Sequence, residues 1–248
     1  MNFDYSGKIA LITGAGSGIG RSIATAFAGA GARVLLVGRR AEALEETAQI
    51  IRDAGGESLA MVGDVTDENT ISDLIAQAGQ LDIAVNAAGV VIPGSLDEMD
   101  AQSFARIFEV NVTGLWLSMK HEIRTLKATG GGVIVNIGSN VGARAVRPGM
   151  GAYAASKAAV SSLTRTAALE AIEHGVRINA LCPGPVDTPL SFRAGEDREA
   201  RDARIAATNP SKRVASREEI ASAVLWLASD GAGYIVGQDI IVDGGASV

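Results

Sequence analysis

Short apolar runs alternate along the chain with longer segments that are rich in alanine. The short runs contain many β-branched residues and predict strands that are buried on both faces. They lie at 9–13, 34–37, 59–62, 83–88, 133–137, 176–182 and 240–242. The longer segments place apolar residues at helical spacing, which predicts helices over 19–30, 41–54, 67–78, 100–128, 152–173 and 217–229. This alternation predicts an α/β fold, a doubly wound Rossmann-type parallel sheet of about seven strands with helices on both faces.

The sequence shows no sign of a boundary between domains. It contains no linker rich in proline and serine, no low-complexity segment and no repeat with a period of roughly 20–50 residues. A chain of 248 residues can bury a large core without a disulfide or a structural metal, which agrees with the single cysteine, Cys182. We therefore predict one domain over residues 1–248.

Charge and hydropathy exclude several classes of protein. Lys and Arg number 22 against 28 Asp and Glu, a net charge of −6 without any basic run, which argues against a nucleic-acid partner. No apolar stretch approaches the ~20 residues that span a bilayer, and the start MNFDYSGK lacks the charged and apolar regions of a signal peptide. We expect a cytoplasmic protein with no membrane partner. The 30 glycines are left unexplained by these arguments.

Residues 192–204 depart from the alternation, because they carry four arginines and four acidic residues. One interpretation is a solvated helix with ion pairs one turn apart, such as Asp197 with Arg201. The other interpretation is a mobile lid. The composition favours the helix.

Part of the glycine excess lies in one turn, TGAGSGIG at residues 13–20, between the first predicted strand and the first predicted helix. This placement lets backbone N–H groups contact a pyrophosphate. Gly14 permits a tight turn, Gly18 lets the cofactor approach the backbone, and Gly20 lets the helix pack closely on the strand. The spacing resembles the TGxxxGxG motif of short-chain dehydrogenases/reductases.

Further motifs of this family follow in order, and the resemblance covers nearly the whole chain. Asn86-Ala87-Ala88-Gly89 resembles the motif NNAG, Tyr153 to Lys157 resembles YxxxK, and Pro183-Gly184 through Thr188 resembles PGxxxT. Asn111 and Ser139 complete the family's catalytic set. The second Asn of NNAG is replaced by Ala87. Ser139 lies 14 positions before Tyr153, where many members of the family have 13.

Tyr153 and Lys157 would share one face of a helix, about 6 Å apart along its axis. The ammonium group of Lys157 is expected to lower the pKa of the phenol from about 10 towards neutral. The resemblance implies that Tyr153 is the general acid/base and that Lys157 also holds the nicotinamide ribose. It further implies that Ser139 donates a hydrogen bond to the substrate oxygen and that Asn111 binds a water linking Lys157 to solvent.

Cofactor choice depends on the end of the second predicted strand, where an acidic residue would select NAD(H). Here Gly38 is followed by Arg39 and Arg40, either of which can bind a 2′-phosphate, so we predict NADP(H) over NAD(H). The resemblance implies that Asp64 binds the adenine, Ile19 the pyrophosphate and Thr188 the carboxamide. The complete set of expected cofactor residues is Gly14, Ser17, Gly18, Ile19, Gly20, Arg39, Arg40, Asp64, Val65, Asn86, Ala87, Gly89, Tyr153, Lys157, Pro183, Gly184, Val186 and Thr188.

Other reactive residue types have simpler interpretations. Cys182 ends an apolar strand, so we expect a buried, unreactive thiol. His121 and His174 have no partner at ligand spacing, so no metal site is expected. Arg144 and Arg147 are either solvated or form a site for an anionic group of the substrate.

The function that these observations favour is transfer of a hydride between NADP(H) and a small ketone or secondary alcohol. One alternative is an NAD-dependent dehydrogenase of polyols or other secondary alcohols. A second alternative is a cofactor-binding sensor without activity, although the presence of Tyr153 and Lys157 argues against it. A loop at about 186–212 is expected to set specificity. The resemblance also implies a homotetramer or a homodimer.

Overall fold

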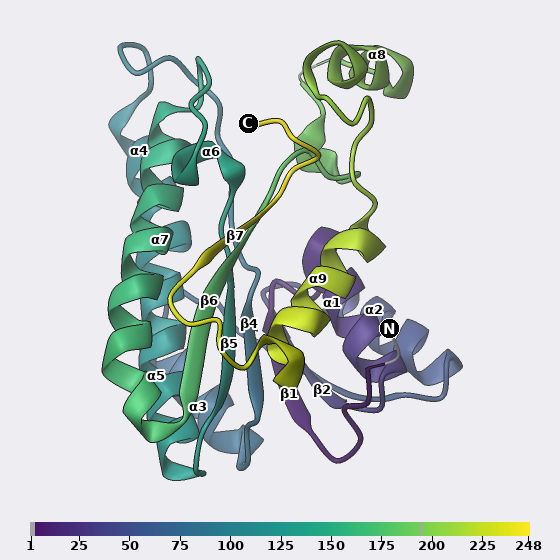
Figure 1. Cartoon of the computed structure of the whole chain (residues 1–248), viewed down its shortest axis with the longest axis vertical. Coiled ribbons are helices and arrows are strands. Elements are labelled where there is room, and N and C mark those ends of the chain that lie inside the picture. The colour runs from purple at the N-terminus through teal and green to yellow at the C-terminus, as the bar shows by residue number, and fades with distance from the viewer. Residues whose placement is uncertain (1–2, 194) are drawn as a thin grey trace.

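A computed structural model of the chain describes residues 3–193 and 195–248. Its strands form one seven-stranded sheet in the order β3-β2-β1-β4-β5-β6-β7, and every pair is parallel (Figure 1). The strands are β1 Ile9–Thr13, β2 Arg33–Gly38, β3 Glu57–Val62, β4 Ile83–Asn86, β5 Gly132–Ile137, β6 Val176–Pro183 and β7 Asp239–Val242. The predicted fold class is confirmed. The strand order reverses between β1 and β4, which is where such sheets bind ligands.

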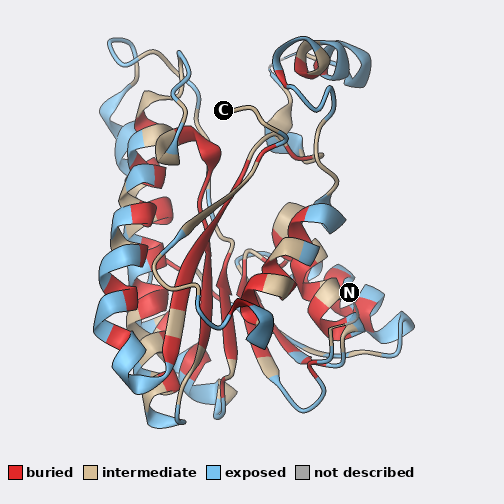
Figure 2. Cartoon of the chain, in the orientation of Figure 1, coloured by how far each residue is buried: buried red, intermediate tan, exposed pale blue. Residues whose placement is uncertain are grey.

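Helices cover both faces of the sheet (Figure 1). One layer comprises α1 Gly18–Gly29, α2 Ala41–Asp53 and α9 Arg217–Ala228, and the other comprises α3 Glu68–Ala78, α4 Ala101–Phe108, α5 Leu115–Ala128 and α7 Gly151–Ala171. Within β1, Ile12 packs into the first layer and Leu11 into the second, as the two-residue period of a strand requires. Most of the sheet is therefore buried on both sides (Figure 2).

The predicted helix at 100–128 is interrupted. A π-helix over Glu109–Gly114 separates α4 from α5. At the end of this turn the backbone approaches the loop after β3 closely, because a Cβ on Gly114 would lie 2.6 Å from a methyl carbon of Val65. A π-turn adds a residue to the helical repeat and is common at functional sites, but it leaves no trace in the apolar spacing of the sequence.

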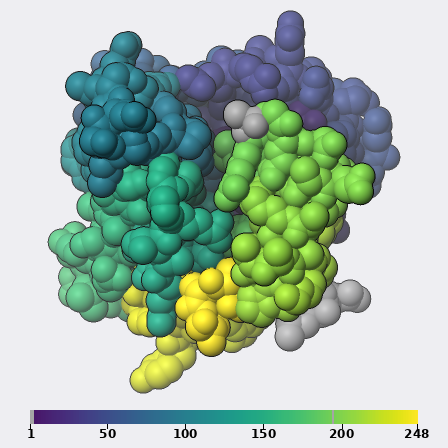
Figure 3. All heavy atoms as spheres, turned by 90° about the horizontal axis from the view of Figure 1, so that it is seen from above, coloured from purple at the N-terminus to yellow at the C-terminus, as the bar shows by residue number. Residues whose placement is uncertain are grey.

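The charged segment that departs from the alternation contains a short helix, α8 Arg198–Thr208. Asp197 is its N-cap and accepts a hydrogen bond from the backbone of Ala200 at 2.8 Å. The helix lies beyond the carboxyl ends of the strands, on the same side as α6 Asn140–Ala143 (Figures 1 and 3). Ala194, within this segment, lies outside the described residues. No helix in the described part of the chain is both long and apolar enough to cross a membrane.

Candidate active site

A cavity of about 550 Å³ opens at the carboxyl ends of the strands. All of the expected cofactor residues except Asn86 line it, and so do Ser139, Tyr153 and Lys157 of the expected catalytic set. Two parts of its wall can be distinguished. The glycine-rich wall comprises Gly14, Gly16, Ser17, Gly18, Ile19 and Gly20, and the α8 wall comprises Pro189, Leu190, Ser191, Arg204 and Ile205.

The glycine-rich wall is shaped by close backbone contacts. Gly14 has a φ of +69°, and a Cβ there would lie 2.9 Å from the carbonyl oxygen of Ala87. A Cβ on Gly20 would lie 2.3 Å from the carbonyl oxygen of Gly14, so the first turn of α1 packs directly on the end of β1. The N-cap residue Ser17 makes no side-chain hydrogen bond to this turn, and the turn contains no acidic residue. Its N–H groups therefore suit an anionic ligand.

Three of the four expected catalytic side chains meet near the carboxyl end of β5. Ser139 follows β5 and is the N-cap of α6, whereas Tyr153 and Lys157 lie on α7. The Nζ atom of Lys157 donates to the carbonyl oxygen of Ile137 at 2.8 Å and lies 5.8 Å from the centre of the Tyr153 ring. The side chain of Ser139 lies close enough to the phenol to lower its pKa. Segments from β5, α6 and α7 thus bring a phenol, a hydroxyl and an amine to one place.

Burial dominates the titration of this group. It raises the pKa of Tyr153 above its ordinary value, while the nearby side chain of Ser139 partly offsets that rise. Burial also lowers the pKa of Lys157 to about 8, because the site disfavours the charged ammonium group. The expectation that Lys157 brings the phenol pKa towards neutral is not met in this structure, because burial raises that pKa and Lys157 is not among the groups that lower it.

Asn111 lies behind this group and does not line the cavity. Its amide nitrogen donates to the carbonyl oxygen of Val90 at 3.0 Å and to the hydroxyl of Ser156 at 3.1 Å, and its oxygen accepts from the N–H of Val90 at 2.8 Å. A Cβ on Gly89 would lie 3.3 Å from the Asn111 oxygen and 3.7 Å from the Lys157 nitrogen. The π-helix therefore fixes the loop after β4 beside Lys157.

Asn86 does not fit its expected contact with the cofactor. Its amide nitrogen donates to Glu122 at 2.8 Å and to Asn136 at 3.1 Å, inside the layer of α5 and α7. The alternation along β4 explains this direction, because Ala84, two residues earlier, packs in the same layer. Glu122 is fully buried, and burial raises its pKa to about 7. Neither its burial nor its partner is apparent from the spacing of the sequence.

The expected cofactor-selecting residues lie beside a third arginine that the sequence did not single out. Arg39, Arg40, Arg106 and Asp64 all line the cavity. A carboxylate oxygen of Asp64 lies 3.9 Å from guanidinium nitrogens of both Arg39 and Arg106. Arg106 belongs to α4, far along the chain from the second strand, so no local motif indicates its position.

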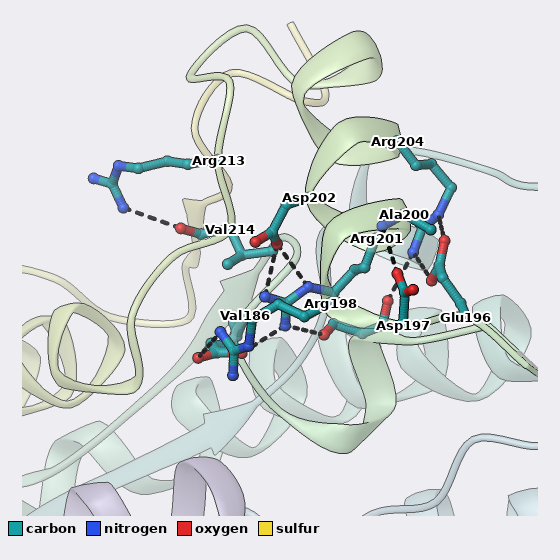
Figure 4. Close-up of polar contacts among 12 residues, drawn as sticks. Val186, Glu196, Asp197, Arg198, Ala200, Arg201, Asp202, Arg204, Arg213 and Val214 are labelled. Carbon is teal, nitrogen blue, oxygen red and sulfur yellow. Dashed lines mark hydrogen bonds and ion pairs between the residues drawn. The ribbon is translucent and has the colours of Figure 1, made fainter.

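The predicted ion pair between Asp197 and Arg201 is wrong. The Arg201 side chain is 1% exposed and binds Asp187, Asp202 and the hydroxyl of Ser191. Figure 4 shows it directed from α8 towards the loop after β6, while Asp197 caps the helix. The helix that was expected to be solvated is thus anchored by a buried arginine. Its partner Asp187 lies outside the helix, so the spacing of charges along the helix does not identify it.

A second arginine of α8 is also paired. Arg204 forms two hydrogen bonds of 2.7 Å with the carboxylate of Glu196 and donates to the carbonyl oxygen of Ser191 at 2.9 Å (Figure 4). Arg204 and Ile205 reach the cavity. These contacts place α8 where a lid over the cavity would lie.

The other candidate residues from the sequence are two histidines, one cysteine and two loop arginines, and most of them lie outside the cavity lining. Cys182 is buried as predicted, and burial raises its pKa to about 12, which disfavours a reactive thiolate. Over residues 3–193 and 195–248, no three His, Cys, Asp or Glu side chains gather in a way that could hold a metal. His121 contacts Glu68 and His174 contacts Glu173, both at 3.3 Å. Of the two loop arginines, Arg147 lines the cavity and Arg144 does not.

Comparison with known proteins identifies the family. The sequence model of a family described as enoyl-(acyl carrier protein) reductase matches residues 14–247. A cis-4-hydroxycyclohexanecarboxylate dehydrogenase of Sinomonas cyclohexanicum is 41% identical over 99% of this chain and 98% of its own. The crystal structure of a short-chain type dehydrogenase/reductase from Mycobacterium marinum has 35% identity and a TM-score of 0.90, covering 99% and 97% of the two chains. This chain belongs to the short-chain dehydrogenase/reductase family.

A further member of the family has a structure that contains a nicotinamide cofactor together with a second ligand. It is a 7α-hydroxysteroid dehydrogenase complexed with NADH and 7-oxo glycochenodeoxycholic acid, with 33% identity and a TM-score of 0.91 over 100% of this chain and 97% of its own. The chain described here is accordingly an NAD(P)-dependent oxidoreductase. This result favours an enzyme over a sensor without activity.

Proposed function

We propose that this member of the family transfers a hydride between NADP(H) and a ketone or secondary alcohol, with Tyr153 as the general acid/base. The observation that carries the proposal is the meeting of Tyr153, Ser139 and Lys157 in the same cavity as the glycine-rich wall. The three side chains supply a proton donor, and the glycine-rich wall supplies a place for a pyrophosphate.

The residues present fit a nicotinamide dinucleotide. The space that a Cβ on Gly14 or Gly20 would fill is taken by backbone, and the uncapped first turn of α1 offers N–H groups to the pyrophosphate. The other contacts follow the family, with Asp64 at the adenine, Lys157 at the ribose and Thr188 at the carboxamide. Val65, Ala87, Gly89, Tyr153, Pro183, Gly184 and Val186 are proposed to lie elsewhere along the cofactor. The bound nicotinamide supplies the hydride for reduction or accepts it in oxidation.

In the reductive direction the Tyr153 hydroxyl gives a proton to the substrate oxygen, to which Ser139 donates a hydrogen bond. The raised pKa of Tyr153 keeps the phenol protonated at neutral pH, which suits this step. In the oxidative direction the deprotonated Tyr153 oxygen takes the alcohol proton. Asn111 holds the loop at Gly89 beside Lys157, and we propose that it also holds the water that links Lys157 to solvent.

The preference for NADP(H) is supported by charge. Arg39, Arg40 and Arg106 line the same part of the cavity, and the only acidic residue in the described lining is Asp64. A planar guanidinium binds a 2′-phosphate through two hydrogen bonds. NAD(H) is the second candidate, because Asp64 lies near two of these arginines and a related structure holds NADH.

Two variants test the proposal. Tyr153→Phe is expected to lower turnover of any ketone at least about 1,000-fold while NADPH still binds, since only the proton donor is lost. Arg39→Ala should lower kcat/KM for NADPH about tenfold or more and leave that for NADH unchanged. Appreciable turnover by Tyr153→Phe would contradict the role of Tyr153. A wild-type preference for NADH would contradict the choice of cofactor.

Two further features are proposed on family grounds. We propose that residues 186–212 form the substrate loop of a single domain, which is consistent with Leu190 and Arg204 lining the cavity. We also propose a homotetramer or homodimer, which size-exclusion chromatography with light scattering would test.

A further inference from the structure

The charge of the cavity is opposite to the charge of the chain. The protein has a net charge of −6, yet the described lining contains six cationic side chains and one carboxylate. The cations are Arg39, Arg40, Arg106, Lys157, Arg147 and Arg204, and the carboxylate is Asp64. A cleft lined by one sign of charge concentrates ligands of the other sign. The proposed function already uses the first four cations for the cofactor, which leaves Arg147 and Arg204.

These two arginines differ in whether their charge is already neutralised. Arg204 is held by the carboxylate of Glu196 through two hydrogen bonds of 2.7 Å. Arg147 is exposed, and within the described residues its guanidinium has neither an ion pair nor a hydrogen bond. Its donors are therefore available to a ligand.

The backbone that carries Arg147 is fixed. Pro148 and Gly149 occupy the centre of a turn in which Gly149 has a φ of +74° and the N–H of Met150 donates to the carbonyl oxygen of Arg147 at 3.1 Å. This combination is typical of a type II turn. The N–H of Gly94 donates to the carbonyl oxygen of Gly149 at 2.9 Å, which joins the turn to the loop after β4. Arg147 is thereby held six residues before Tyr153.

The rest of this part of the cavity is largely apolar. Val141, Met150, Leu190 and Ile205 are among the apolar residues of the same lining. Apolar surface with one unneutralised guanidinium suits an organic molecule that carries an anionic group on an apolar body. The planar fork of arginine matches the two oxygens of a carboxylate.

We propose that Arg147 is a specificity residue that binds a carboxylate group on the substrate, so that the preferred substrates are oxo acids or hydroxy acids. The proposal rests on the proposed function, because it concerns the ketone or alcohol that Tyr153 acts on. Arg144 provides a matched control, since it lies three residues earlier in the same exposed loop and does not line the cavity.

The experiment compares three keto acids with their primary amides, which have nearly the same shape but no charge: 4-oxopentanoate, 5-oxohexanoate and 4-oxocyclohexanecarboxylate. With NADPH and NADH, wild type should reduce at least one acid with a kcat/KM about tenfold or more above that of its amide. Arg147→Ala should remove most of this difference by lowering kcat/KM for the acid about 10- to 100-fold, with the amide nearly unchanged. Arg147→Lys should retain part of the preference, and Arg144→Ala should retain all of it.

The opposite results would overturn the proposal. These are equal kcat/KM for acids and amides in wild type, equal losses for both in Arg147→Ala, or an effect of Arg144→Ala as large as that of Arg147→Ala. Dependence on Arg147 shown by a keto sulfonate or keto phosphate but by no keto acid would also overturn the assignment to a carboxylate. If a neutral ketone is reduced and no acid is preferred, this proposal fails and the proposed function stands. If no ketone is reduced with either cofactor, the proposed function fails.

Discussion

The glycine-rich wall of the cavity is built from backbone, whereas the α8 wall is held by long charged side chains. On the first wall, Gly14 and Gly20 let neighbouring segments approach to distances that exclude a Cβ. On the second, Arg201 binds Asp187 and Arg204 binds Glu196. A backbone surface offers the same N–H groups to every ligand and tolerates little change, while a wall of side chains can be altered without moving the sheet. The proposed functions follow this difference: the glycine-rich wall binds the cofactor that the family shares, and the α8 wall contacts a substrate particular to this protein.

The largest of three further predicted effects concerns the backbone wall. Gly20→Ala places a Cβ 2.3 Å from the carbonyl oxygen of Gly14, so the turn must open. We expect the Kd for NADPH, measured by fluorescence titration, to rise about 100-fold or more, because the N–H groups no longer converge on the pyrophosphate. Circular dichroism would show whether the variant remains folded.

Gly29→Ala is the matched control. Gly29 is also in α1, but no heavy atom lies within 4 Å of where its Cβ would be. This variant should bind NADPH as wild type does. Equal affinity of the folded Gly20→Ala variant and wild type would show that the close approach is not required.

The features that could be predicted from the sequence are those with a local cause. The strands follow from apolar runs, and the glycine-rich wall follows from a turn between a strand and a helix. The direction of Asn86, the burial of Arg201 and the place of Arg106 depend on partners in other elements, such as Glu122, that the spacing does not identify. The π-helix at Asn111 was also not predicted, since one additional residue in a turn barely alters the apolar pattern.

A smaller effect is expected behind the loop after β4, where Asn86 binds Glu122. One oxygen of each side chain, Oδ1 of Asn86 and Oε1 of Glu122, lacks a hydrogen-bond partner among the described residues. A proton on Oε1 of Glu122 would make this oxygen a hydrogen-bond donor, which Oδ1 of Asn86 lacks. A protonated Glu122 agrees with a pKa raised from 4.5 to about 7 by burial. Between these values the folded state keeps a proton that the unfolded state releases, so stability should fall as pH rises. Linkage gives a loss of about 2 kcal/mol from pH 5 to pH 8.

Glu122→Gln removes the titration and keeps the shape of the side chain. Urea unfolding at several pH values should show that this variant lacks the fall between pH 5 and pH 8. Glu68→Gln is the control, because Glu68 is exposed and its pKa is lowered by hydrogen bonds with Lys120 and His121, so it does not titrate in this range. The same pH dependence in Glu122→Gln and wild type would contradict the assignment of the proton to Glu122.

The smallest of the three effects tests the wall of side chains. Arg201 and Arg198 both contact Asp187, but the Arg201 side chain is 1% exposed and that of Arg198 is 68% exposed. Exposed ion pairs contribute little, whereas the buried Arg201 side chain also binds Asp202 and the hydroxyl of Ser191, so its removal takes away several contacts at once. Because Asp187 precedes Thr188 in the loop after β6, Arg201→Met should loosen the α8 wall and raise KM for the substrate about tenfold, with a smaller change in the Kd for NADPH.

Arg198→Ala should leave both constants unchanged, and this difference between two arginines on one carboxylate is the informative result. If Arg201→Met weakened NADPH binding as strongly as substrate binding, the two walls would be coupled through the loop that carries Asp187 and Thr188. The contrast between backbone and side chains would then describe how the walls are built but not how they act. If KM rises alone, the α8 wall can be changed to accept another substrate while the glycine-rich wall continues to bind the same cofactor.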